Sequence, residues 1–161
     1  HVTEVAGWLT ATFNNTSANP LNVPNAKLII TNAVENRTYL LEELECPTNV
    51  FQIKSYVFSG YDYLTKVVVG NHVTSVGASS FYKCSKLQHI VLGEKLTSIG
   101  SSAFSGCTQL SLVEYRAENV TSTNSAFDSN SGNTTNPTKL VIGSKVKRIP
   151  NSLFSSMSSL E

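Results

Sequence analysis

Apolar residues recur along this chain at a constant interval. Four phenylalanines repeat with a period of 23, and a fifth follows at an interval of 27: Phe58, Phe81, Phe104, Phe127 and Phe154. Four leucines each lie six residues after one of these phenylalanines: Leu64, Leu87, Leu110 and Leu160. A fixed period of 20–50 residues indicates stacked structural units. We therefore predict a solenoid, in which each unit covers the apolar side of the next.

Two adjacent units match residue by residue. Residues 70–81 read Gly-Asn-His-Val-Thr-Ser-Val-Gly-Ala-Ser-Ser-Phe, and residues 93–104 read Gly-Glu-Lys-Leu-Thr-Ser-Ile-Gly-Ser-Ser-Ala-Phe. Residues 143–154 form a third copy, 47–58 a degenerate one, and 116–127 the most degenerate. This agreement between units fixes the phase of the repeat.

The segment before each repeat glycine predicts a short β-strand, because it is rich in Val, Ile and Leu. We expect Leu87, Ile90 and Leu92 to point inward, and Gly93 to form a turn where a residue without Cβ can take a positive φ. The predicted strands are 64–69, 87–92, 110–115 and 139–142.

Each unit continues after its glycine with further apolar residues, such as Val73 and Val76, and with a Phe-x-x-Cys step that closes the coil. We predict an α/β repeat solenoid, a right-handed coil with a parallel sheet on its concave face. Irregular turns or short helical pieces are expected on the other side.

The pattern from Leu87 to Cys107 is Leu-x-x-Ile-x-Leu-Gly-x-x-Leu-x-x-Ile-Gly-x-x-Ala-Phe-x-x-Cys, and it resembles the BspA-like leucine-rich repeat family. The resemblance covers residues 41–161, ends within a repeat, and is clearest over 58–116. It implies a secreted or cell-surface protein that is not an enzyme and that adheres to host or microbial surface proteins, with extracellular-matrix proteins as possible partners. The closing cysteine is replaced by Tyr61, Asn130 and Met157 in three units.

Residues 1–40 do not fit the period. Leu28 and Ile30 resemble a degenerate first strand, and we expect Trp8, Leu9 and Phe13 to belong to an N-terminal cap over the first coil. The domain prediction is therefore a cap with a degenerate first rung over 1–40 and repeats over 41–161.

Charge is low and balanced, with 12 Lys and Arg against 11 Asp and Glu, so neither nucleic acid nor an anionic membrane is favoured as a partner. No apolar run approaches the roughly 18 residues that indicate a transmembrane helix. The expected location is extracellular or at the cell surface.

The cysteines leave two interpretations open. Cys84 and Cys107 occupy the same position in neighbouring units, so they form either a disulfide or a ladder of buried free thiols. Cys46 is expected in the core, and His89 on a strand position that points away from Cys84. With only Asp62 and Asp128 as aspartates, we find no catalytic triad, no metal-ligand cluster and no phosphate loop, and we predict no catalysis and no cofactor.

Outward strand positions are the candidate protein-binding site. They would form an apolar stripe flanked by charges, which often marks a partner site, although β-branched residues are also exposed singly on strands. A spacer that presents another domain is the alternative function. The insertion over 128–138 is expected to be a flexible loop, either functional or merely tolerated. The candidate residues are Lys66, Val68, His89, Val91, Leu112, Glu114, Lys139 and Val141, with Glu43 and Glu45 on an earlier coil.

Overall fold

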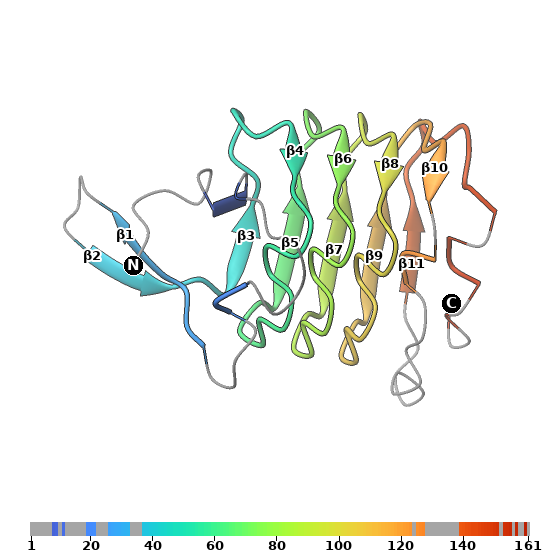
Figure 1. Ribbon diagram of the computed structural model, residues 1–161. Helices are drawn as coiled ribbons and strands as arrows, with labels where there is room; N and C mark the ends of the chain where they lie inside the picture. The colour runs from blue at the N-terminus through green and yellow to red at the C-terminus, as the bar shows by residue number, and fades with distance from the viewer. Residues whose placement is uncertain are drawn as a thin grey trace.

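The chain forms a parallel β-solenoid of about four turns, as seen in a computed structural model (Figure 1). The structure describes residues 8–9, 11, 19–21, 26–32, 37–123, 125–127, 139–151, 153–155, 157 and 160. Within these residues the only α-helical positions are Trp8 and Leu9. The expected solenoid is confirmed, and it consists of strands and turns in this part of the chain.

One side of the solenoid is a five-stranded parallel sheet in the order β11-β9-β7-β5-β3. Its strands from β5 onward fall inside the predicted segments, with Lys66 paired to His89 and His89 to Leu112. Consecutive coils thus align the same repeat position, as the period of 23 requires. The bounds are β3 (Glu43–Glu45), β5 (Lys66–Val69), β7 (His89–Leu92), β9 (Leu112–Tyr115) and β11 (Lys139–Ile142).

The opposite side is also a parallel sheet, where the sequence had predicted only turns or short helical pieces. Its four strands run in the order β10-β8-β6-β4. Each strand has two residues, too few to show the alternation by which a strand is recognised in a sequence. The bounds are β4 (Gln52–Ile53), β6 (Ser75–Val76), β8 (Ser98–Ile99) and β10 (Ser122–Thr123).

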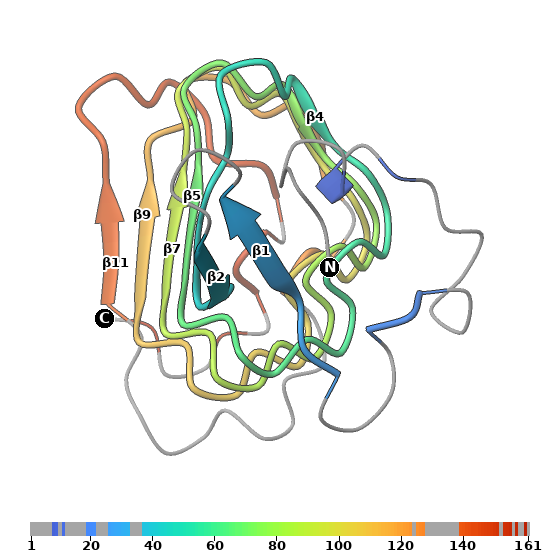
Figure 2. The ribbon, with the colours of Figure 1, turned by 90° about the vertical axis from the view of Figure 1, so that its left-hand side faces the viewer.

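The phenylalanines form one continuous column inside the coils. Ring centroids of successive members lie 5.5, 5.3 and 5.1 Å apart from Phe58 to Phe127, and Phe154 follows at 5.3 Å. The first four rings are fully buried or nearly so. Figure 2, which looks along the solenoid, shows successive coils superimposed around this interior. Each coil therefore shields the ring of its neighbour, as predicted.

All three cysteines are free and buried. The Cys84 thiol donates to the Phe58 carbonyl oxygen at 3.2 Å, and the Cys107 thiol donates to the Phe81 carbonyl oxygen at 3.4 Å. The ladder of thiols is thus the correct alternative, and no disulfide joins the coils.

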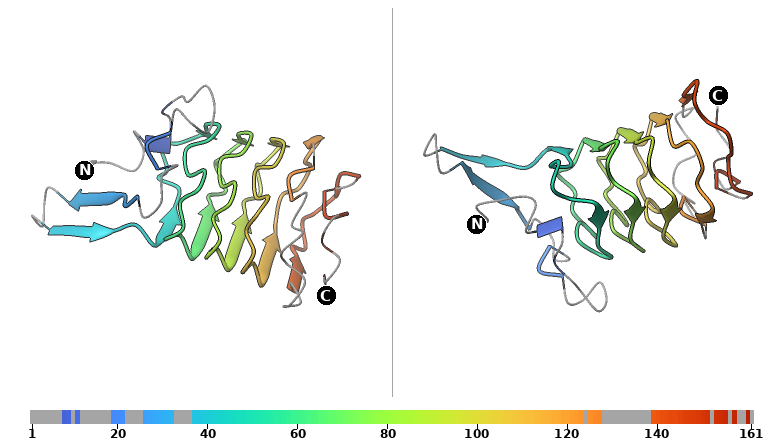
Figure 3. Two further views of the ribbon diagram at one scale, coloured as in Figure 1. Left: turned by 60° about the horizontal axis from the view of Figure 1, so that its bottom comes forward. Right: turned by 90° about the horizontal axis from the view of Figure 1, so that it is seen from above.

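The N-terminal region contacts the first coil. Leu9 is fully buried, and the Trp8 indole N–H donates to the Val57 carbonyl oxygen at 2.7 Å. Strands β1 (Ile29–Asn32) and β2 (Arg37–Leu40) form their own antiparallel sheet beyond β3, so this segment is not a further strand of the repeat sheet (Figure 3). Phe13 lies outside the described residues, as does the insertion over 128–138.

Candidate functional site

The outward side chains of the five-stranded sheet lie in straight rows across the strands. We call this surface the sheet face. One row joins Lys66, His89, Leu112 and Lys139, and Glu43 extends it onto β3. The second row contains Glu45, Val68, Val91, Glu114 and Val141. The register therefore brings all eight predicted site residues onto one surface.

The apolar residues of the sheet face are less exposed than the sequence predicted. Val91, expected to be exposed, is buried, with 5% of its surface accessible. Val68 and Leu112 are partly covered, and of the four apolar site residues only Val141 is exposed, at 39%. The expected apolar stripe is thus largely covered.

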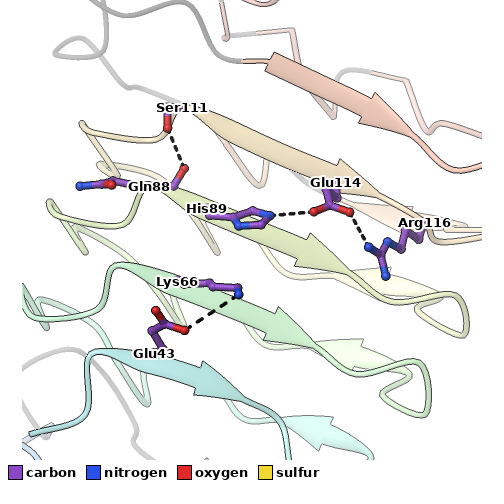
Figure 4. Close-up of polar contacts among 7 residues, drawn as sticks. All are labelled: Glu43, Lys66, Gln88, His89, Ser111, Glu114 and Arg116. Atoms are coloured by element: carbon purple, nitrogen blue, oxygen red, sulfur yellow. Dashed lines mark hydrogen bonds and ion pairs between the residues drawn. The ribbon is translucent and has the colours of Figure 1, made fainter.

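A polar network lies next to Val91 on the sheet face. Its in-register neighbour Glu114 accepts a hydrogen bond from His89 Nε2 at 2.9 Å, and His89 precedes Val91 by two residues on the same outward side (Figure 4). The second Glu114 oxygen contacts the Arg116 guanidinium at 2.5 Å. The middle of the sheet face therefore presents charged and polar groups in place of the valine.

The network also sets the ionisation of its carboxylate. The hydrogen bond from Arg116 holds the pKa of Glu114 below its ordinary value of 4.5, and the hydrogen bond from His89 acts in the same direction against partial burial. Glu114 is therefore a carboxylate at neutral pH.

Charge is distributed unevenly from one edge of the sheet to the other. The first strand carries Glu43 and Glu45, and Glu43 approaches Lys66 to 3.9 Å. From residue 88 onward the sequence contains six Lys and Arg against five Asp and Glu: Lys95, Arg116, Lys139, Lys145, Lys147 and Arg148 against Glu94, Glu114, Glu118, Asp128 and Glu161. On the sheet face itself, the β3 edge thus presents two glutamates and the β11 edge presents Lys139, while the second half of the chain is nearly balanced in charge.

Arg116 was not among the predicted site residues, although the repeat marks it. The register aligns it with Gly93 on one side and with Gly143 on the other. These positions, together with Gly70, are the repeat glycines. Arg116 is therefore the one charged residue in a row that otherwise holds Pro47 and glycines, and comparing the units at this position would have identified it.

A notch opens beside Arg116, where the turn after β11 follows. Its volume is about 270 Å³, and its lining includes Gly143, Ser144 and Lys145. Lys145 reaches across the intervening coil to Glu94, with Nζ at 3.1 and 3.0 Å from the two carboxylate oxygens. Small residues thus leave a polar hollow at the border of the sheet face.

Neither a metal-ligand cluster nor an accessible thiol occurs among the described residues. They contain no group of three or more His, Cys, Asp or Glu side chains placed to hold a metal ion. Burial raises the pKa of Cys46 and of Cys107 to about 12. These thiols are therefore protonated and enclosed, the opposite of an activated nucleophile. No described helix is long and apolar enough to cross a membrane.

Stacked coils with a parallel sheet along one side and a constant repeat period define a leucine-rich repeat solenoid. The family model of the BspA type leucine rich repeat region matches residues 27–161, in six copies. The chain belongs to this family, and the resemblance seen in the sequence is confirmed.

The fold is also similar to that of a solved structure, a leucine rich cell surface protein from Faecalibacterium prausnitzii. The two chains are 26% identical with a TM-score of 0.59, and the match covers 85% of this chain. It covers 37% of the other chain, so the present chain spans little more than a third of that relative's length. No curated protein matches the sequence.

Proposed function

We propose that this chain is a non-enzymatic protein-binding module of a secreted or cell-surface protein, and that the sheet face is its binding surface. The single observation that carries the proposal is the alignment of Lys66, His89, Leu112 and Lys139, which gives one continuous outward surface over successive coils. Family membership and a cell-surface relative support an interaction role.

The coils favour binding by a preformed surface. Backbone hydrogen bonds link each coil to the next at the strands and at the closing step, for example from Phe81 N to the Ala103 oxygen at 2.8 Å. A surface held by such contacts loses little conformational freedom when a partner docks, so more of the interaction energy contributes to affinity. The ligand class is a host or microbial surface protein, extracellular-matrix proteins included, and the role is adhesion.

The test is capture of a panel of extracellular-matrix and microbial surface proteins by the immobilised chain, measured by biolayer interferometry. Acidic substitutions at accessible positions, Lys66→Glu, Lys139→Glu and Val141→Glu together, are preferable to changes at buried Val91, which would endanger the fold. We expect the triple variant to lose binding while its circular dichroism spectrum and melting temperature stay near wild type.

Lys83→Glu is the matched control, because Lys83 is an exposed lysine of the closing step, away from the sheet face. It should bind as the wild type does. If the triple variant binds as well as Lys83→Glu, the sheet face is not the binding surface. If neither the chain nor its variants capture any panel member, the result favours a spacer that presents another domain.

A further inference from the structure

The two ends of the solenoid differ in how well the core is covered. At the first coil, Leu9 is fully buried and the Trp8 indole N–H donates to the Val57 carbonyl oxygen. At the other end, the coil that contains β11 leaves apolar side chains accessible. The described residues include four exposed large hydrophobic side chains, and three of them belong to this coil: Val141, Ile142 and Ile149, at 39, 44 and 43%. Within the described residues, the core is therefore open at the β11 end.

The exposure of Ile142 is a departure from its repeat position. Ile142 is aligned with Tyr115 on β9, and Tyr115 with Leu92 on β7. Both of these residues are fully buried. Each is flanked by the strand of the following coil, whereas Ile142 lies on the last strand of the sheet order. The surface at Ile142 is thus of the kind that two coils bury between them.

The open surface extends across the whole coil. Ile142 belongs to the five-stranded sheet. Ile149 has the repeat position of Ile99, five residues before the repeat phenylalanine. Ile99 is buried and belongs to β8 of the opposite sheet. A partner that added only one strand would cover Ile142 and leave Ile149 in water, whereas the end of a second solenoid can cover both.

The backbone of β11 also has groups that face away from the sheet. The Leu92 carbonyl oxygen accepts from Arg116 N at 3.0 Å, and the Tyr115 carbonyl oxygen accepts from Gly143 N at 2.8 Å. In both cases the donor belongs to the following coil. By register the Ile142 carbonyl faces the free edge of β11, and Leu140 faces the same way because strand geometry repeats every two residues. This edge can therefore pair with another strand.

The two edges of the five-stranded sheet are protected differently. Sheets that stay unpaired usually carry charged side chains or a covering segment at the edge. On β3 the outward residues are Glu43 and Glu45, and β1 and β2 lie beyond this strand (Figure 3). On β11 the one charged residue is Lys139, and Leu-Val-Ile follows it. Figure 1 shows β11 and the β1-β2 pair at opposite ends of the solenoid. The β11 edge is thus the unprotected one.

We propose that this end binds a second copy of the chain, through antiparallel pairing of the two β11 strands about a twofold axis at Val141. The N-terminal end of the copy is covered, so the contact joins like ends and closes at a dimer. The interface combines a strand pair with apolar side chains that reach from one sheet to the other. The inference is independent of the proposed binding function, because it concerns the end of the solenoid.

The position of the axis follows from the strand itself. Directly opposite residues of an antiparallel pair lie on the same side of the sheet, so the axis must pass through a residue. With the axis at Val141, Leu140 lies opposite Ile142 of the partner subunit, and the backbone groups that face the free edges bond to each other. Lys139 lies opposite Gly143 of the partner subunit, so no like charges meet. The two Val141 side chains face each other across the axis.

The dimer would present its binding surfaces together. Pairing within the plane of the sheet leaves the two sheet faces on the same side of the molecule. A ligand with two binding sites could then engage both, which raises its overall affinity without any new contact.

The test is sedimentation velocity of the full chain from about 2 to 200 µM, since mass action makes a reversible dimer depend on concentration. We expect the average mass to rise from near 17.4 kDa towards twice that value. A mass that stays at 17.4 kDa throughout would overturn the proposal and assign the open end to another occupant, such as a further coil. A mass that passes twice this value would also overturn it, because like ends close at two copies.

Val141→Lys is the decisive variant. Val141 is an outward, exposed residue, so the lysine does not enter the core of its own chain. Two ammonium groups would face each other across the axis, and like charges in a cross-strand pair repel. We expect the dissociation constant of the dimer to rise at least about tenfold, with an unchanged circular dichroism spectrum. An unchanged dissociation constant would contradict the proposal.

Val68→Lys is the matched control, because Val68 lies in the same row of the sheet face, on the interior strand β5. It should dimerise as the wild type does. If it weakens the dimer as much as Val141→Lys does, the contact is made by the sheet face and the proposed end-to-end pairing is wrong.

An equimolar mixture of Val141→Lys and Val141→Glu tests the position of the axis. In a mixed dimer the ammonium and the carboxylate lie opposite each other, and opposite charges stabilise a cross-strand pair. We expect dimers in the mixture at concentrations where either variant alone is monomeric. A mixture that stays monomeric would show that the two Val141 positions do not meet, and the proposal would fall.

Discussion

The rings of Phe81 and Phe104 are almost parallel, with planes 1° apart and centroids separated by 5.3 Å. They occupy the same position of consecutive repeats and therefore belong to consecutive coils. The Phe81 N–H also donates to the Ala103 carbonyl oxygen at 2.8 Å, so backbone and side chains are stacked by the same repeat. This pair shows how a period in the sequence becomes contact between coils.

Removing one ring should strongly destabilise the chain. Phe81 is fully buried between two other rings, and Phe81→Ala is expected to lower the free energy of unfolding by about 3–5 kcal/mol, through lost burial and the cavity left behind. Urea denaturation followed by circular dichroism measures this. Phe51→Ala is the control, because Phe51 is 59% exposed, and it should cost much less. Equal effects of the two substitutions would contradict a buried aromatic column.

The aromatic column could be predicted from the sequence because a constant spacing needs no knowledge of tertiary contacts. The second sheet was missed, since a strand such as Ser75–Val76 is too short to show a pattern. The burial of Val91 was missed for another reason: it depends on side chains of neighbouring coils, which the alternation along a single strand does not show. Arg116, by contrast, was visible in the sequence as a departure from glycine.

The buried thiols should make the fold sensitive to alkali. Burial raises the pKa of Cys107 from 9.0 to about 12, and the pKa of Cys84 is raised as well. Between these values the unfolded chain releases protons that the folded chain retains. The contribution of each protonated thiol to the free energy of unfolding is therefore complete below pH 9. It is lost as pH rises towards 12, at roughly 1.4 kcal/mol per pH unit for each thiol.

Urea midpoints measured from pH 8 to 11 check this expectation. Cys107→Ala should unfold at lower urea at every pH, because it leaves a cavity, but its stability should fall less steeply above pH 9. A reagent for free thiols should react with the wild-type chain only after unfolding. Rapid reaction of the native chain would show that the cysteines are accessible.

The Glu114 carboxyl group should titrate below its ordinary pKa of 4.5, because the Arg116 guanidinium and His89 hydrogen-bond to its charged form. Stability linked to this group is present above pH 4.5 and is lost as pH falls through the lowered pKa. ¹³C NMR of the carboxyl carbon gives the midpoint directly. Arg116→Gly should raise it, whereas Lys83→Gln should leave it unchanged. A midpoint insensitive to Arg116→Gly would mean that the contact does not persist in solution.

Close packing of consecutive coils is best tested at the repeat glycines Gly70 and Gly93. A Cβ added at Gly93 would lie 2.4 Å from the Gly70 carbonyl oxygen. Because that oxygen belongs to the backbone of the neighbouring coil, the clash is relieved only if the two coils move apart. A Cβ added at Gly70 would meet the His72 side chain, which can move aside if it gives up its 2.8 Å hydrogen bond with the Pro47 carbonyl oxygen. Gly93→Ala should therefore cost about 1–3 kcal/mol of unfolding free energy by overpacking, and Gly70→Ala only about 0.5–1.5 kcal/mol, for the lost His72 hydrogen bond. Because the two glycines occupy the same repeat position, any difference in intrinsic backbone preference largely cancels between the variants. Urea denaturation of both variants measures the contrast, and equal stability would show that the spacing between these coils is not set by glycine.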